Sequence, residues 1–134
     1  VLTHKNKGEG QRHTVKTCLA YTLKPTASLQ DALHRPVAAH RLDGPTGGLL
    51  VAAKTRTAAV ELSRQFAERE VKKTYTAIVA GKLEGEGIVE IPLRGLEAVT
   101  RFRALRHCRS LKYEHCTLVA LSPETGRTHQ LRRH

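Results

Sequence analysis

The sequence predicts an α+β fold, in which helices and strands share one chain without the regular alternation of parallel α/β proteins. Two observations lead to this class. Apolar residues recur at helical spacing in some stretches, whereas others alternate or form short apolar runs of strand length. These stretches follow one another in mixed order, so no series of βαβ units emerges. A chain of 134 residues, 40% of them hydrophobic, suits a single globular domain with a buried core.

The first predicted elements lead into a loop that is dense in Gly, Pro and Asp. Pro25 interrupts the chain after an early short helix, and a short strand is expected over residues 37–39. The loop covers residues 40–48, and the apolar run of residues 49–53 behind it has the length of a strand. Three apolar residues at spacings of three and four predict the early helix: Val15, Cys18 and Leu19.

A second helix is predicted from Thr55, whose side chain suits an N-terminal cap, to about Arg69. Lys72 and Lys73 lie at or just past its C-terminal end, where the helix dipole favours positive charge. One apolar stripe is expected to face the core, formed by Ala59, Leu62, Phe66 and Ala67.

The rest of the chain is predicted to be mostly strands. The alternating stretch that begins at Lys73 ends at Gly81, and Pro92 stops the next strand. Thr125 and Gly126 then turn into a basic segment that begins a helix. The four expected strands cover residues 73–79, 88–91, 98–105 and 113–121.

Basic residues dominate the charge of the chain, above all in its last quarter. Lys and Arg total 23 against 12 acidic residues, which gives a net charge of +11 and a pI near 10.1. From Arg101 onward, eight basic residues face two acidic ones. This excess favours a polyanionic partner, because each neutralised phosphate releases counterions. Nucleic acid fits better than a membrane, since no strongly amphipathic basic helix is apparent and no apolar run approaches the ~20 residues that cross a bilayer.

The three cysteines, Cys18, Cys108 and Cys116, predict a reducing compartment inside the cell. Their odd number and unpaired spacing give no disulfide framework. Two His-Cys pairs, at 107–108 and 115–116, superficially suggest a zinc site. Neighbours on a strand point to opposite faces, and the usual close Cys spacing is missing, so no metal site is predicted.

The loop of residues 40–50 carries a candidate catalytic carboxylate. Its sequence is HRLDGPTGGLL, with Asp43 between two apolar stretches. Catalytic groups are often held on loops by a rigid scaffold. The alternative is a turn Asp that hydrogen-bonds its own backbone. The neighbouring Arg41 and His40 only modestly favour the catalytic interpretation.

Two further segments carry candidate side chains. Residues 73–81, KTYTAIVAG, present Tyr75, whose ring and hydroxyl suit stacking on a base and proton exchange. An ordinary core tyrosine is the alternative. Residues 125–132, TGRTHQLR, place Arg127 at a Gly turn before a helix, where backbone N–H groups suit phosphate and a guanidinium suits a carboxylate. A basic helix end on the surface is the alternative there.

Together and in this order, the three segments resemble the signatures of the RluA-type pseudouridine synthases, HRLDxxTSGLL, KxYxAxVxG and TGRxHQ[IL]R. The resemblance covers residues 36–134, whereas residues 1–35 match poorly, and Gly47 replaces the family's Ser after Thr46. It implies a pseudouridine synthase catalytic core with a mixed, largely antiparallel sheet, flanking helices and a central RNA-binding cleft. Residues 1–134 would then form a single catalytic domain that is incomplete at both ends.

The resemblance also implies a reaction and the residues for it. In this family a uridine in RNA is isomerised without cofactor or metal: the N1–C1′ bond breaks, the base turns, and C5 joins C1′. Asp43 corresponds to the essential aspartate, Tyr75 to the tyrosine that contacts the base, and Arg127 to the residue that pairs with the aspartate. RNA contacts are expected from the other motif residues, namely Arg41, His40, Thr46, Lys73, His129, Gln130, Leu131 and Arg132.

The predicted function is therefore isomerisation of specific uridines, in ribosomal or transfer RNA, by a monomer that binds no membrane. A catalytically silent RNA-binding homologue is one alternative, and a basic ribosome-associated protein is another. The basic net charge is compatible with a ribosome-associated protein, but such a protein would not explain why the three motifs occur together. The catalytic interpretation requires Asp43, Tyr75 and Arg127 to converge in one cleft, with Arg41 at its rim to help displace the target nucleotide.

Overall fold

A computed structural model describes residues 14–24, 26 and 30–134 of the chain. The chain packs into two compact units, of which the first ends at Glu70 and the second begins at Val71. The sequence predicts a single catalytic domain, and whether the two units together form that domain stays a prediction. Pro25, predicted to interrupt the chain after the first helix, lies outside the described residues. Within the described ranges, no helix has both the length and the apolar character needed to cross a membrane.

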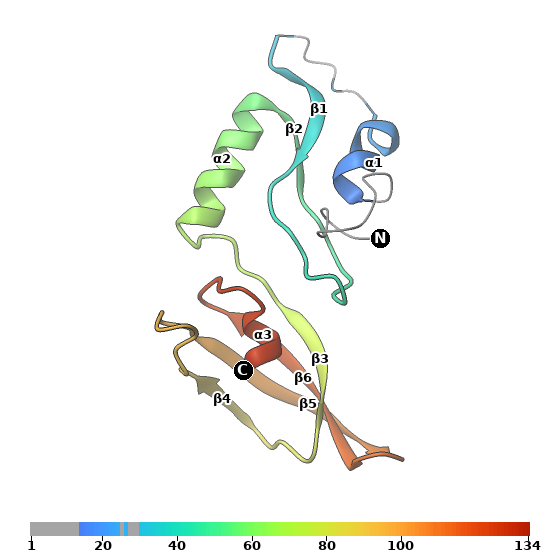
Figure 1. The fold of residues 1–134 in the computed structure, drawn as a ribbon, viewed down its shortest axis with the longest axis vertical. Coiled ribbons are helices and arrows are strands. Elements are labelled where there is room, and N and C mark those ends of the chain that lie inside the picture. Colours follow the sequence, from blue (N-terminus) through green and yellow to red (C-terminus); the bar gives the residue numbers. More distant parts are fainter. Residues whose placement is uncertain (1–13, 25, 27–29) are drawn as a thin grey trace. The chain divides into compact units, whose positions relative to one another are not determined.

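The first unit pairs a two-stranded antiparallel sheet with helices (Figure 1). Its helix α1 spans Val15–Thr22, as the apolar spacing predicts, and buries Leu19. Strand β1 (Ala32–Ala38) pairs with β2 (Ala52–Thr55), and helix α2 (Arg56–Ala67) follows directly. The apolar run of residues 49–53 does not all belong to the strand, because β2 begins only at Ala52 and Leu49 is 91% exposed.

The start of helix α2 is held by side chains, as the capping residue predicts. The Thr55 hydroxyl accepts a hydrogen bond from the Ala58 N–H at 3.1 Å. The Asp31 carboxylate accepts from the Thr57 N–H at 3.2 Å, and the hydrogen bonds from Thr57 lower the pKa of Asp31. The helix ends at Ala67, two residues before the predicted Arg69, because the backbone at Arg69 adopts a φ of 62° that no α-helix continues.

The second unit contains a four-stranded antiparallel sheet in the order β3-β6-β5-β4 (Figure 1). Its strands are β3 (Tyr75–Ala80), β4 (Glu86–Val89), β5 (Thr100–Ser110) and β6 (Glu114–Pro123). The short helix α3 spans Gln130–Arg133, where the sequence predicts that a helix begins. The hairpin of β5 and β6 is longer than predicted, and a bulge interrupts its register between Ala104 and Arg106.

One face of this sheet forms the core of the second unit. Directly paired residues share a face, so Tyr75 on β3, Leu121 on β6 and Phe102 on β5 lie in one row on that face. Val119 is fully buried in the next row along the strands. Gly87 continues the row onto β4, and a Cβ there would lie 2.8 Å from the Phe102 ring, so a side chain at this position would force the ring to shift.

Candidate active site

The Asp43 loop connects β1 to β2 within the first unit. The Thr46 N–H donates to the Asp43 carbonyl at 2.9 Å, which closes a tight turn around Gly44 and Pro45. Leu42, beside the aspartate, is 9% exposed and anchors the loop, while Asp43 itself is half-buried. The loop therefore presents the carboxylate from a defined turn next to a buried side chain.

Hydrogen bonds and a ring contact close the base of this loop. The Ala39 N–H donates to the Val51 carbonyl at 2.8 Å, and the Val51 N–H donates to His40 Nε2 at 3.0 Å. The His40 ring also stacks on Phe66 of α2, with ring centroids 5.0 Å apart and an interplanar angle of 27°. Residues 40 and 51 are thereby tied together at the two ends of the loop.

The two glycines in the loop differ in what they tolerate. Gly48 has a φ of +144°, a backbone conformation that residues with side chains rarely adopt, whereas Gly47 has no such strain and open space where a Cβ would lie. We expect Gly48→Ala to lower the free energy of unfolding by about 1–2 kcal/mol. Gly47→Ser, which introduces the family's hydroxyl, should change it by less than about 0.5 kcal/mol. Thermal unfolding of both variants tests this contrast, and equal effects would contradict it.

The second motif residues lie at the entrance to strand β3. Tyr75 is the first residue of the strand and is half-buried on the core-facing side of the sheet, and Lys73 is half-buried just before it. Thr100 lies on the same face as Tyr75, two residues before Phe102 on β5. Because Gln130 and His134 both bind Thr100, the Arg127 segment and Tyr75 belong to the same face of the sheet.

Arg127 lies in the turn between β6 and α3 and is held at its Nε atom. That N–H donates to the Glu97 carbonyl at 2.8 Å, and the Arg127 backbone N–H donates to Gln130 Oε1 at 2.9 Å. The guanidinium is thus held at the turn through its Nε atom, and a guanidinium can bind an anion through two parallel N–H groups.

The side chain of Gln130 organises this turn from within. It is 4% exposed, and its Oε1 accepts from the Thr125 hydroxyl at 2.7 Å as well as from Arg127. Its Nε2 donates to the Val99 carbonyl at 2.9 Å and to the Thr100 hydroxyl at 3.0 Å. Every hydrogen-bonding position of this amide is used inside the protein. Its contacts therefore favour a structural role over the RNA contact expected from the sequence.

The remaining predicted RNA contacts lie on or near the surface of their own units. In the first unit, Arg41 is exposed and Thr46 is half-buried. In the second unit, His129 and Arg132 are exposed and Leu131 is half-buried. His129 adopts a left-handed backbone with a φ of 56°, which is uncommon for a residue with a side chain and which starts helix α3 at a sharp angle.

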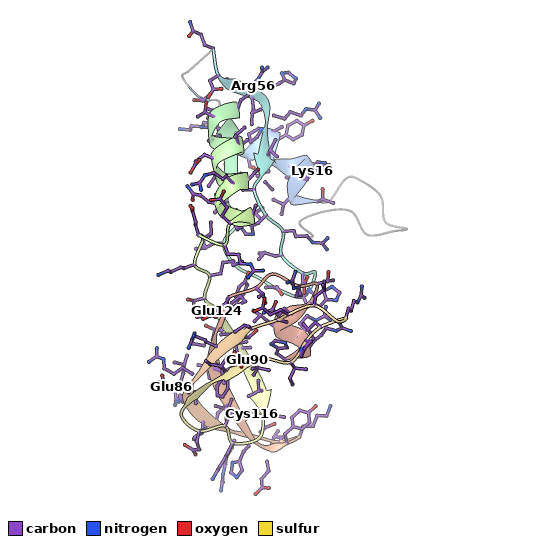
Figure 2. The ribbon with its side chains drawn as sticks, turned by 90° about the vertical axis from the view of Figure 1, so that its left-hand side faces the viewer. Lys16, Arg56, Glu86, Glu90, Cys116 and Glu124 are labelled. Atoms are coloured by element: carbon purple, nitrogen blue, oxygen red, sulfur yellow. The ribbon has the colours of Figure 1, made fainter. Side chains whose placement is uncertain are left out.

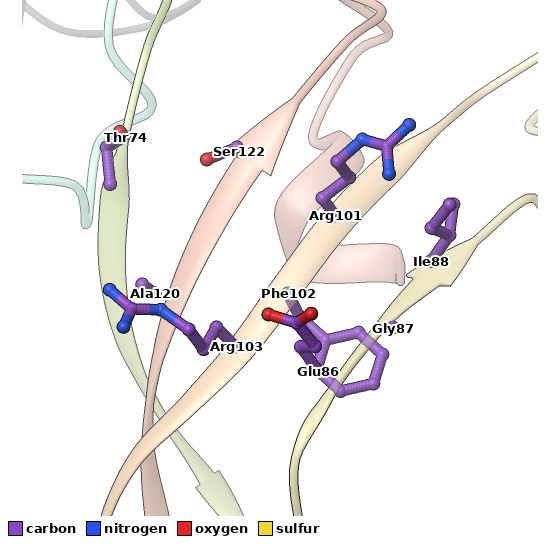
Figure 3. A pocket seen from close by; sticks show the side chains of 9 residues that line it. All are labelled: Thr74, Glu86, Gly87, Ile88, Arg101, Phe102, Arg103, Ala120 and Ser122. Carbon is purple, nitrogen blue, oxygen red and sulfur yellow. The ribbon is translucent and has the colours of Figure 1, made fainter.

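A hollow of about 500 Å³ lies in the second unit beside strands β4, β5 and β6 (Figure 3). Figure 3 shows Arg101 and Arg103 along β5, with Thr74 and Ser122 across from them. Arg101 forms an ion pair with Glu124, which is labelled in Figure 2. Glu86 also lines the hollow, so its charges largely compensate one another. None of the three predicted catalytic residues lines it.

Three residues of these networks were not recognised as site residues in the sequence. Thr125 and Thr100 are 2% and 1% exposed and bind Gln130, and Phe66 supports His40. Thr125 begins the third motif, so its position in TGRTHQLR was the available clue. Thr100 and Phe66 lie far from the motifs in sequence, and only the folded chain brings them to Gln130 and His40.

Asp43 belongs to the first unit, and Tyr75 and Arg127 belong to the second. Their convergence in one cleft stays a prediction.

The cysteines are free thiols, and Cys108 lies directly opposite Cys116 across β5 and β6. Among the residues that the structure describes, no three His, Cys, Asp or Glu side chains gather as a metal site would require.

Solved structures share this architecture. The human RNA pseudouridylate synthase domain containing 1 matches 72% of this chain and 48% of its own, with a TM-score of 0.65 and 28% identity. The human RNA pseudouridylate synthase domain containing 4 matches 98% of this chain and 55% of its own, with a TM-score of 0.73 and 24% identity, a likeness of fold. The predicted α+β class with a largely antiparallel sheet is confirmed.

Sequence comparison identifies the family. Residues 1–134 match the family model described as RNA pseudouridylate synthase. The chain is 47% identical over 105 residues to the ribosomal large subunit pseudouridine synthase D of Nitrosomonas europaea, covering 71% of this chain and 30% of that protein. It is 42% identical over 111 residues to the dual-specificity RNA pseudouridine synthase RluA of Yersinia pestis, covering 71% and 52%. The chain belongs to the RNA pseudouridylate synthase family, and it spans about a third of the first relative and about half of the second.

Proposed function

We propose that this chain is the catalytic core of an RNA pseudouridine synthase that isomerises specific uridines in ribosomal or transfer RNA. The observation that carries the proposal is the ordered Asp43 turn, closed at its base, in a chain that belongs to this family. The names of two relatives, a ribosomal large subunit enzyme and a dual-specificity enzyme, support RNA as the substrate class.

The proposed reaction rearranges one nucleotide and consumes no co-reactant. The bond from N1 of uracil to C1′ breaks, the base turns, C5 bonds to C1′, the proton of C5 leaves, and N1 takes up a proton, so the product is an isomer of the substrate. The Asp43 carboxylate acts as the nucleophile or stabilises the charge that develops at C1′. Tyr75 contacts the base and helps remove the C5 proton. Arg127, held at Nε, pairs with the Asp43 carboxylate in the proposed site through a charge-assisted hydrogen bond.

The target uridine must leave its stack or pair before it reaches Asp43. Such a movement costs a few kcal/mol in nucleic acids. Arg41 is exposed and two residues from Asp43, so it is placed to displace the nucleotide. Contacts to the surrounding RNA come from the other exposed or half-buried motif residues, namely Thr46, Lys73, His129, Leu131 and Arg132. We further propose a monomer that binds no membrane and works in a reducing compartment, where its three cysteines stay thiols.

Release of tritium from RNA that carries C5-labelled uridine tests the proposed activity directly, because C5 loses its hydrogen when it bonds to C1′. We expect release from ribosomal or transfer RNA incubated with the intact gene product. RNA binding without tritium release from any RNA class would instead favour a catalytically silent homologue. The presence of Asp43, Tyr75 and Arg127 argues against that second interpretation.

The binding of RNA should weaken steeply as salt rises. The net charge is +11, and each phosphate contact contributes to the slope of log affinity against log salt. With about six phosphate contacts we expect roughly a thousandfold loss of affinity between about 50 and 200 mM salt. Filter binding across this range measures the slope. An affinity that does not change with salt would contradict electrostatic binding.

A further inference from the structure

His40 begins the first motif, three residues before Asp43, and its ring is engaged inside the protein. Its Nε2 accepts the Val51 N–H at 3.0 Å, and its face lies against Phe66 of α2, with centroids 5.0 Å apart. The side chain is half-buried, unlike the exposed His34 on β1. One nitrogen and one face of this ring are thus engaged inside the protein.

The contact to Val51 replaces the last rung of the sheet between β1 and β2. Ala38 pairs with Ala52, and the next residue, Ala39, donates its N–H to the Val51 carbonyl at 2.8 Å. In a complete antiparallel rung the Val51 N–H would return to the Ala39 carbonyl. It binds the His40 ring instead. The imidazole thereby ends the ladder and marks where the loop begins.

The direction of this hydrogen bond defines the state of the ring. A backbone N–H only donates, so Nε2 must carry a lone pair, and a neutral imidazole of this kind has its proton on Nδ1. A phenyl ring at this position would keep the stacking and lose the acceptor. A glutamine would keep an acceptor oxygen near the place of Nε2 and lose the ring.

We propose that His40 is a positioning residue that closes the base of the Asp43 loop, so that it acts through the loop and not by touching RNA. Its consequence for catalysis rests on the proposed function. The loop between the two tied ends contains Gly44, Gly47 and Gly48, which restrict the backbone little. A fixed base is therefore needed to keep the Asp43 carboxylate in place, and a displacement of about 1 Å at a reacting group can lower the rate roughly a hundredfold.

Kinetics of four single variants of the intact gene product test the proposal. His40→Phe should lower kcat about tenfold to a hundredfold, with KM for RNA within about twofold of the unmutated protein. His40→Gln should restore most of the rate, because it returns the acceptor. Phe66→Leu removes the stacking partner and should lower kcat with the same unchanged KM. His34→Gln, on the exposed side of β1, serves as the matched control and should change neither value.

Two results would overturn the positioning role. One is a tenfold or larger rise in KM for His40→Phe with kcat unchanged, together with no effect of Phe66→Leu, because a direct RNA contact behaves in this way. The other is a failure of His40→Gln to recover any rate lost in His40→Phe. If His40→Phe does not fold, the comparison of His40→Gln, Phe66→Leu and His34→Gln still decides between the two roles.

A measurement without RNA separates this proposal from the proposed function. In the free protein, ¹⁵N chemical shifts should place the His40 proton on Nδ1, and the Val51 amide should exchange with solvent at least about tenfold more slowly than in His40→Phe. Equal exchange rates would overturn the positioning role whatever the activity is. Slow exchange at Val51 in a protein that forms no pseudouridine would contradict the proposed function and leave the closed loop intact.

Discussion

Asp43→Asn should abolish pseudouridine formation while the protein still binds RNA. The substitution keeps the size of the side chain and the turn, which depends on the Asp43 carbonyl and not on its carboxylate. It removes the negative charge that the reaction needs at C1′. We expect the rate to fall at least about a thousandfold, as losses of a nucleophile do in other enzymes. RNA affinity should stay within about twofold, since one neutralised carboxylate changes little of a strongly basic surface.

The chain provides a control of the same chemistry. Asp31 is the other of its two aspartates, and its carboxylate binds the start of helix α2. Asp31→Asn keeps an acceptor oxygen for the Thr57 N–H, so the isomerisation rate should remain near the unmutated value. Tritium release and filter binding are measured side by side for both variants. Near-normal activity of Asp43→Asn would remove Asp43 from the catalytic residues.

Gln130→Leu should give the largest loss of stability among the substitutions considered. It leaves the Thr125 hydroxyl, the Arg127 N–H, the Val99 carbonyl and the Thr100 hydroxyl without their shared partner. Each buried polar group that loses its hydrogen bond costs about 1–3 kcal/mol, although some of these groups will find water. We expect the free energy of unfolding to fall by about 2–4 kcal/mol.

Urea unfolding followed by circular dichroism measures this loss. Arg133→Leu introduces the same side chain at an exposed position of the same helix and should change stability by less than about 0.5 kcal/mol. Gln130→Leu should also loosen the turn that holds Arg127, so the rate of isomerisation should fall even under conditions where the variant is folded. Equal stability of Gln130→Leu and the unmutated protein would contradict the role of this amide.

The sequence predicted the elements that depend on local chemistry. Thr55 caps α2 as expected, and the alternation after Lys73 forms strand β3. The apolar run of residues 49–53 was misjudged, because length and hydrophobicity alone do not separate a strand from an apolar loop. Leu49 is 91% exposed, which no local pattern in the sequence indicates.

The three motifs predict the residues of the candidate site, and the roles of these residues stay predictions. The three motifs located Asp43, Tyr75 and Arg127, and each lies on a loop, strand or turn of the kind expected. His40 and Gln130, which the sequence predicts to contact RNA, have hydrogen bonds within the protein, and the His40 ring stacks on another ring. Their partners, Phe66 and Thr100, are 26 and 30 positions away in sequence, so a motif read locally does not reveal them.

A bulge in β5 between Ala104 and Arg106 interrupts the long hairpin, whereas β6 alternates without interruption on the other side of it. Up to Ala104 the alternation places Phe102 on the core side, and past the bulge the count restarts with Arg106 opposite Leu118. A change in the length of the hairpin at its far tip, around residues 110–114, therefore leaves the residue pairs of the Phe102 row unchanged. One added rung, with a residue on each strand, would extend that tip and leave Tyr75 where it is. We therefore expect an epitope or label inserted at this tip to be accommodated.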